Sequence, residues 1–195
     1  VCDAVLERTR SAAVLAKVAV TNVPLRPVDA SHEWYRLNPM FREMLQTELR
    51  RTEPGVRAAM HRRAGDWHRQ AGDLDRAIDH ACSAGDLDRS GMLLWDNLPG
   101  YLGQGRNDAV QHWLNGITAD QASGSAAFAL TAAHSHLARG SVAVAERWAH
   151  SATVALSRRT AGSDNEHRAG NAIIGAWAAR SGPARMSEEA ARAYD

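Results

Sequence analysis

Small and apolar residues recur every three or four positions along most of the chain, which is the spacing of one face of an α-helix. The segment that opens at Asn38 and Pro39 shows this best, because it has an asparagine to cap the helix and a proline for its first turn. Its predicted buried face comprises Met40, Phe41, Met44, Leu45 and Leu49. Two more helices are predicted before it, over 3–8 and 11–22, with Ser11 as the N-cap of the second.

The region between residues 23 and 37 departs from the helical pattern. Pro24 and Pro27 break helices, and the run 33–37 (Glu-Trp-Tyr-Arg-Leu) has the aromatic content of a strand. We therefore predict a small β-hairpin here. The order helix, helix, hairpin, helix is that of a winged-helix domain whose first part is missing, so residues 1–53 are interpreted as a partial winged-helix segment.

Paired helices with Gly-Asp corners are predicted from residue 54 onward. The sequence Ala-Gly-Asp-Leu-Asp-Arg at 71–76 recurs at 84–89, and internal repetition is typical of stacked helical units. The clearest unit, about 126–159, has small residues at the spacing of a tetratricopeptide repeat. A second unit covers 64–81 with one extra residue before its glycine, and a third begins at Gly175. We expect 54–195 to form a tetratricopeptide-like array of helical hairpins, an α-solenoid.

Between the first two units, the segment 93–114 is predicted to be helical but interrupted. Four helix-breaking residues fall within it, namely Pro99, Gly100, Gly103 and Gly105.

Composition supports an all-α fold, because 37 of the 195 residues are alanine, a strong helix former and a weak strand former. The formal net charge of +1 argues against non-specific nucleic-acid binding by the whole chain. Cys2 and Cys82 form no C-x-x-C pair, and no apolar run approaches the roughly 20 residues of a membrane helix. We expect a cytoplasmic protein without a membrane partner. Because the chain begins at Val1 rather than Met, we also expect a piece of a longer protein.

Motifs that would indicate catalysis are absent from the sequence. It contains neither the phosphate-binding G-x-x-x-x-G-K-[ST] motif nor a G-x-S-x-G nucleophile elbow. The predicted helix 11–22, which would occupy the recognition position of a DNA reader, carries only Lys17 as a basic residue. We therefore predict that the chain is neither an enzyme nor a DNA reader.

The spacing of the histidines also argues against a metal site. His134 and His136 are two residues apart and would point about 200° apart on a helix, whereas His61 and His68 would lie about 10 Å apart along one. Histidines scattered over a surface or groove are the better interpretation. The six tryptophans are expected mostly in the core, with Trp113 the least certain among them.

The inner face of the helical array offers the remaining candidate site. In paired-helix repeats the first helix of each pair lines a concave surface. In the unit around 64–81, the inward positions are His61, Gly65, His68 and Arg69. In the unit at 126–159, they are Leu130, His134, Leu137 and Ala138. The candidate ligand or partner residues are His61, His68, Arg69, His134, Arg180 and Trp113. Such a groove suits an anionic or polyhydroxy ligand or a peptide; the alternative is an ordinary solvated face.

Three segments, 34–45, 60–81 and 84–86, together resemble the large ATP-binding LuxR-type (MalT-like) transcription regulators of bacteria. The resemblance covers about residues 1–86. It is specific because it combines two unlike elements, a winged-helix segment and paired helices, in one order. It departs at 37–39, where the family usually has an aromatic residue and two histidines. It implies an upstream ATPase module, a winged-helix segment, a helical array that receives an inducer, and a separate DNA-binding domain.

The resemblance thus implies a sensor that binds an inducer or a partner protein and relays that state to a nucleotide switch. ATP would bind in the missing upstream module, no cofactor or metal is expected in this chain, and DNA would be bound only through a domain absent from it. Self-association is a further possibility. The alternative is a protein-interaction scaffold without a small-molecule ligand. A hydrolase with His134 or His68 as base ranks third, because the sequence shows no converging nucleophile or carboxylate.

Overall fold

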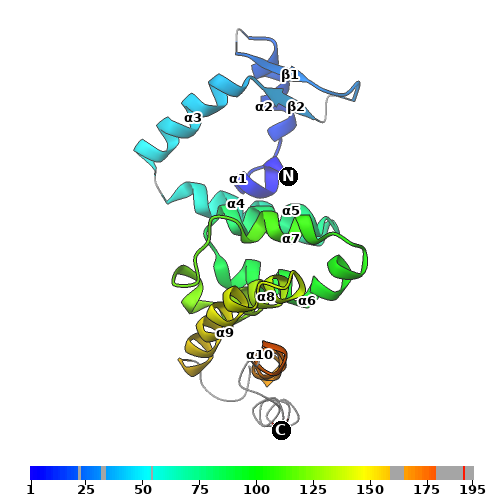
Figure 1. The fold of residues 1–195 in the computed structure, drawn as a ribbon. Helices are drawn as coiled ribbons and strands as arrows, with labels where there is room; N and C mark the ends of the chain where they lie inside the picture. Colours follow the sequence, from blue (N-terminus) through cyan, green and yellow to red (C-terminus); the bar gives the residue numbers. More distant parts are fainter. Residues whose placement is uncertain (22, 32–33, 54, 159–164, 179–190, 192–195) are drawn as a thin grey trace. The chain divides into compact units, whose positions relative to one another are not determined.

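A computed structural model describes residues 1–21, 23–31, 34–53, 55–158, 165–178 and 191. Over these residues the chain is mostly helical, with one small two-stranded hairpin near the N-terminus (Figure 1). The predicted all-α class is confirmed. The chain divides into two compact units, Val1–Gly85 and Asp86–Asp195, so the first helical hairpin belongs to the same unit as the winged-helix segment.

The first unit opens with two short helices, α1 (Cys2–Leu6) and α2 (Ser11–Ala19). The prediction that Ser11 caps α2 is wrong: Arg10 stands at the cap, and Ser11 is the first helical residue. The backbone N–H of Ser11 donates to Oδ1 of Asp3 at 2.8 Å, so a side chain from α1 satisfies this free amide.

The predicted hairpin is confirmed as the antiparallel strands β1 (Leu25–Pro27) and β2 (Tyr35–Leu37). Its register pairs Leu25 with Leu37, Arg26 with Arg36 and Pro27 with Tyr35. In the connection, Oδ1 of Asp29 accepts a hydrogen bond of 2.9 Å from the backbone N–H of Trp34. A side chain thereby holds together the two ends of the loop.

Helix α3 (Pro39–Thr52) begins as predicted, with the side chain of Asn38 accepting hydrogen bonds from the amides of Met40 and Phe41. Its predicted buried face is wrong. Met40 is 81% exposed, Met44 and Leu45 are also exposed, and α3 has no buried residue. Periodicity shows which face of a helix is apolar, but it does not show what covers that face.

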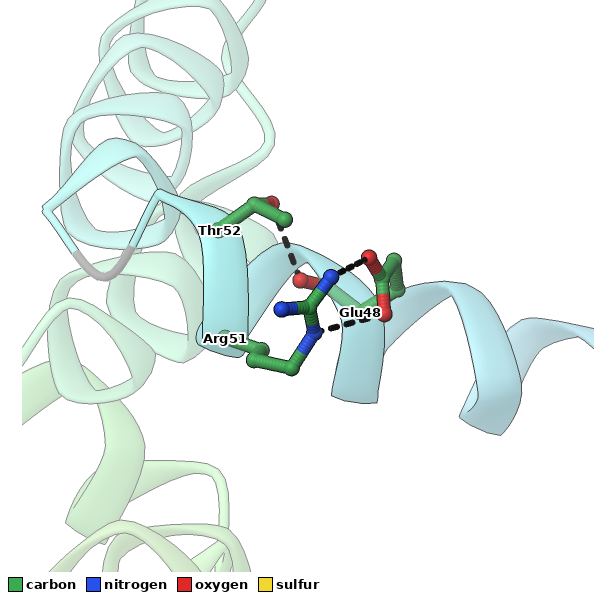
Figure 2. A network of polar contacts seen from close by, with 3 residues as sticks. All are labelled: Glu48, Arg51 and Thr52. Carbon is green, nitrogen blue, oxygen red and sulfur yellow. Dashed lines mark hydrogen bonds and ion pairs between the residues drawn. The ribbon is translucent and has the colours of Figure 1, made fainter.

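The C-terminal turn of α3 is held by contacts around Glu48 (Figure 2). The guanidinium of Arg51 donates two hydrogen bonds to the Glu48 carboxylate, and the hydroxyl of Thr52 donates to the Glu48 backbone carbonyl. Because Arg51 and Glu48 are largely exposed, solvent screens this ion pair, and it orders the end of the helix more than it stabilises the fold.

Helices α4 (Val56–Gln70) and α5 (Leu74–Ser83) form the first hairpin. At its corner Gly72 has a φ of 78°, which favours glycine, and the Asp73 side chain accepts a hydrogen bond from the amide of Arg76. The second copy of the six-residue repeat folds in the same way. There Gly85 has a φ of 71°, and Asp86 accepts from the amide of Arg89 at the start of the next helix.

Replacing Asp86 with alanine should therefore remove a side-chain cap and lower the free energy of unfolding by about 1 kcal/mol. We expect a fall in melting temperature of roughly 2–4 °C, measured by circular dichroism. Asp120→Ala is the matched control, because Asp120 is exposed and stands before a short 3-10 helix without making a cap hydrogen bond. Equal effects of the two substitutions would show that the Asp86 cap is not formed.

The second unit is built around helix α8. Its elements are α6 (Leu87–Gly103), α7 (Asn107–Leu114), η1 (Gln121–Gly124), α8 (Ala126–Ala138), α9 (Val142–Ser157) and α10 (Asn165–Ala178). Helices α8 and α9 form a hairpin around Gly140, whose φ is 74°, which confirms the helical unit predicted over 126–159. Helices α6, α9 and α10 pack against α8, and most of its side chains are buried.

The predicted interruption of helix α6 at Pro99 and Gly100 is wrong, because α6 continues through both residues. It carries a buried stripe of Leu94, Leu98 and Tyr101, and this shared apolar face offsets the hydrogen bond that proline cannot donate. The break comes after α6, where Gly105 has a φ of 71°.

Helices α6 and α8 approach each other closely at Gly91. A Cβ atom there would lie 2.4 Å from the backbone nitrogen of Phe128, so only glycine fits without displacement. Nearby, the hydroxyl of Ser125 donates to the backbone carbonyl of Leu87 at 3.0 Å. The start of α8 is thus held against the start of α6.

The tryptophans only partly follow the predicted core placement. Trp113 and Trp148 are buried, but Trp34 and Trp177 are exposed, which corrects the prediction for these two. Of the third predicted unit, α10 supplies the first helix; the rest lies outside the described residues. In the described parts of the chain, the helices are too short or too polar to cross a membrane.

Candidate functional site

The predicted groove residues lie in both units. His61, His68 and Arg69 are on α4, whereas Trp113 and His134 are on α7 and α8. Arg180 lies outside the described residues. Each group is described within its own unit.

A column of three histidine rings lies between α4 and α5. His61 and His80 share a hydrogen bond of 2.9 Å between their Nδ1 atoms, and His80 stacks on His68 with ring centroids 5.4 Å apart. His68 is only 4% exposed, and Trp67 meets its ring edge-on. We call His61, His68 and His80 the histidine column.

Glycine in α4 makes this column possible. A Cβ atom at Gly65 would lie 3.4 Å from both the Ala77 carbonyl oxygen and the His80 Cβ, so the two helices are in contact there. Three of the α4 positions predicted to face an open groove therefore face α5 instead, namely His61, Gly65 and His68. The fourth, Arg69, is exposed. A role for these residues in binding stays a prediction.

His80 was not found from the sequence, because it is 19 residues from His61 and on the opposite helix. The interpretation of scattered histidines considered spacing within one helix only. Over the described residues, no group of three or more histidine, cysteine or acidic side chains has the arrangement of a metal centre.

The surroundings of His61 and His80 favour neutral rings. Burial is the main cause that lowers the pKa of His61, and the nearby His80 and Arg57 lower it further. Burial also lowers the pKa of His80, as do His68 and Arg76, while Asp79 opposes them. Nδ1 of His68 lies 3.5 Å from a carboxylate oxygen of Asp73.

In the second unit, His134 of α8 faces α10. Its ring lies 6.2 Å from that of Trp177, its Nδ1 atom is buried without a hydrogen-bond partner, and burial lowers its pKa. Trp177 is 66% exposed, and Ile173, one turn earlier in α10, is also exposed. This pairing of a histidine with open apolar side chains could accept a ligand or a partner.

Trp113 is placed differently. Its side chain is buried, and its ring meets Tyr101 edge-on at 5.3 Å between centroids. It therefore fills the core between α6 and α7. A direct contact between Trp113 and a ligand stays a prediction and would require this core to open.

Two arginines join the first hairpin to the winged-helix segment. Arg63 of α4 donates hydrogen bonds to the Val5 backbone carbonyl at 3.1 Å and to the Glu7 carboxylate. The guanidinium of Arg76 lies over the Trp34 ring, 5.7 Å from its centroid. The two parts of this unit are thus connected by the hydrogen bonds and ion pair of Arg63 and by the cation–π contact of Arg76.

Comparison with known proteins gives a match to the MalT winged helix domain over residues 1–57, which confirms this part of the resemblance. The serine/threonine-protein kinase PknK from two Mycobacterium tuberculosis strains, CDC 1551 / Oshkosh and H37Rv, and from Mycobacterium bovis is 33% identical over 98 residues. The match covers 44% of this chain but 9% of PknK, so the chain spans a small part of these relatives. No solved structure matches significantly.

Proposed function

We propose that this chain is a non-enzymatic regulatory module of a LuxR-type, MalT-like transcription regulator. In this proposal the helical hairpins bind an inducer or a partner protein, and the winged-helix segment relays the bound state to an ATP-dependent switch elsewhere in the protein. The observation that carries the proposal is that a MalT-type winged-helix region runs directly into a helical hairpin and is tied to it by Arg63.

The chemistry of Arg63 suits a relay. Its guanidinium binds a backbone carbonyl in the last turn of α1 and the carboxylate of Glu7 beyond it, and a positive charge stabilises a helix C-terminus. Movement of α4 would therefore be transmitted to α1. A ligand can drive such a change only if it binds the two states with different affinities.

We place binding on two of the predicted groove positions. These are the exposed Arg69 in the first unit and the half-buried His134, beside the exposed Trp177, in the second. An arginine and an imidazole recognise anionic or hydroxyl-bearing groups, and an exposed indole adds apolar surface. Within the second unit, His134 and Trp177 suit a small anionic or polyhydroxy inducer or a peptide with these groups; within the first unit, Arg69 suits an anionic group.

A thermal-shift screen with nucleotides, organic acids, oligosaccharides and short peptides tests the proposal. At a hundred times its dissociation constant, a ligand stabilises the chain by about 2.7 kcal/mol, or roughly 5–10 °C. We expect Arg69→Ala or His134→Ala to reduce this shift. Arg147→Ala, an exposed arginine of α9, is the control and should leave it unchanged. A ligand shift that survives both groove substitutions would refute the placement of the site.

A protein-interaction scaffold without a small-molecule ligand is the second candidate. The exposed Trp177 and Ile173 on α10 favour it, because large exposed apolar side chains on one helix are common at protein interfaces. The same screen separates the two proposals. A shift produced only by peptides would favour the scaffold.

The similarity to PknK suggests a different setting for the same relay. That relative is named as a serine/threonine kinase, and the match covers a small part of it. In this version of the proposal, the winged-helix segment would relay the bound state to a kinase domain.

A further inference from the structure

The hydrogen bond between His61 and His80 can hold only one proton. A neutral imidazole has one N–H donor and one acceptor nitrogen, so at 2.9 Å one Nδ1 donates while the other accepts. One added proton can reside on the outer nitrogen of the donating ring and leaves this bond in place. When both rings are protonated, two N–H groups face each other and the bond is lost. His68, stacked on His80 and almost fully buried, places a third titratable ring against this pair.

We propose that the histidine column is a proton-sensitive lock on the first helical hairpin. At neutral pH the shared proton holds α4 to α5. When both rings of the His61–His80 pair have each gained a proton, this bond is replaced by repulsion between two positively charged rings, and the hairpin loosens. The proposal concerns the stability of α4 and α5 and is independent of any ligand.

Charged groups on the neighbouring elements decide how readily His61 and His80 gain a proton. Arg57 on α4 and Arg76 on α5 disfavour a charge on His61 and His80, respectively. Asp79 favours a charge on His80, and Asp73 at the corner faces His68. Helix α1 also packs against α4; its Asp3 accepts a hydrogen bond from Ser11, and Glu7, just after its end, pairs with Arg63. On α3, Glu48 pairs with Arg51.

The sign of the pH dependence follows from these surroundings. The pKa values of His61 and His80 are lower in the folded chain than in the unfolded chain, where histidine titrates near about 6.5. Below that pH the unfolded chain binds more protons than the folded chain. The stabilisation is therefore complete above about pH 7 and is lost as the pH falls through 6.5 toward the folded pKa values.

The test compares the melting temperature of the full 195-residue chain at pH 7.5 and pH 5.5. We expect a fall of roughly 5 °C in the parent chain. The fall should be clearly smaller in His80→Gln, whose amide can still hydrogen-bond to His61 but cannot gain a charge. Part of the fall should remain, because burial also lowers the pKa of His134 and His136. His150→Gln, an exposed position on α9, should retain the full fall. The same fall in His80→Gln as in the parent would overturn the proposal.

A second measurement does not depend on the variant folding. NMR titration of the imidazole protons in the parent chain should show His61 and His80 gaining protons below pH 6.5, with the charging of one ring shifting the titration of the other. Independent titration of both rings at or above the ordinary value of about 6.5 would overturn the proposal.

Discussion

Replacing Gly91 with alanine should lower the free energy of unfolding by about 3 kcal/mol, at the upper end of the usual cost of overpacking. The added Cβ would lie 2.4 Å from the backbone nitrogen of Phe128 and 2.9 Å from its Cα. Backbone atoms of a packed helix cannot rotate aside, so α6 and α8 would have to separate. Urea denaturation followed by circular dichroism measures the change, and the melting temperature should fall by roughly 6–12 °C.

Gly100→Ala is the matched control in the same helix. Apart from the adjoining residues of its own helix, no atom lies within 4 Å of a Cβ at this position, and alanine is favoured over glycine inside a helix by about 0.5–1 kcal/mol. We expect this variant to be equal to or slightly more stable than the parent. If Gly91→Ala behaved in the same way, the close crossing of α6 and α8 would be wrong.

Replacing Ile174 with alanine should destabilise the chain by about 2–5 kcal/mol, because it empties a buried position. Ile174 is only 1% exposed on α10, which packs against α8 and α9. Polar contacts fix this placement: Arg168 donates to the Leu156 carbonyl, and the amide of Asn171 donates to the hydroxyl of Thr153. The same urea denaturation measures the loss.

The neighbouring Ile173 provides the control. It is 45% exposed, so Ile173→Ala removes the same atoms from the same helix but should cost less than about 1 kcal/mol. Similar losses of stability in the two variants would mean that α10 does not pack with Ile174 toward α8 and α9.

Local sequence signals predicted the helices, the hairpin and the Gly-Asp corners. The cap at Asn38 and the repeated corners at Gly72 and Gly85 are determined within a few residues, so they can be identified from the sequence. Pro99 shows the limit of this reasoning. A residue that breaks an isolated helix is tolerated in α6, because the apolar side chains on both sides of it are buried on a shared face.

The candidate site could be predicted less completely. The positions of His61 and His68 on one face of α4 follow from their spacing, but their contact with His80 depends on how α4 meets α5. The approach depends in turn on Gly65, which leaves room for the opposite helix. Contacts between helices therefore needed the structure.

The alanine-rich composition of α8 determines where the chain can tolerate amino-acid substitutions. Neighbouring helices pack on several of its sides, and positions such as Ala129, Ala132 and Ala133 are fully buried. A larger residue at any of these positions would meet an adjoining helix, and glycine would weaken the helix itself. Sequence divergence should therefore be slowest along α8 and fastest on the outer faces of the helices around it.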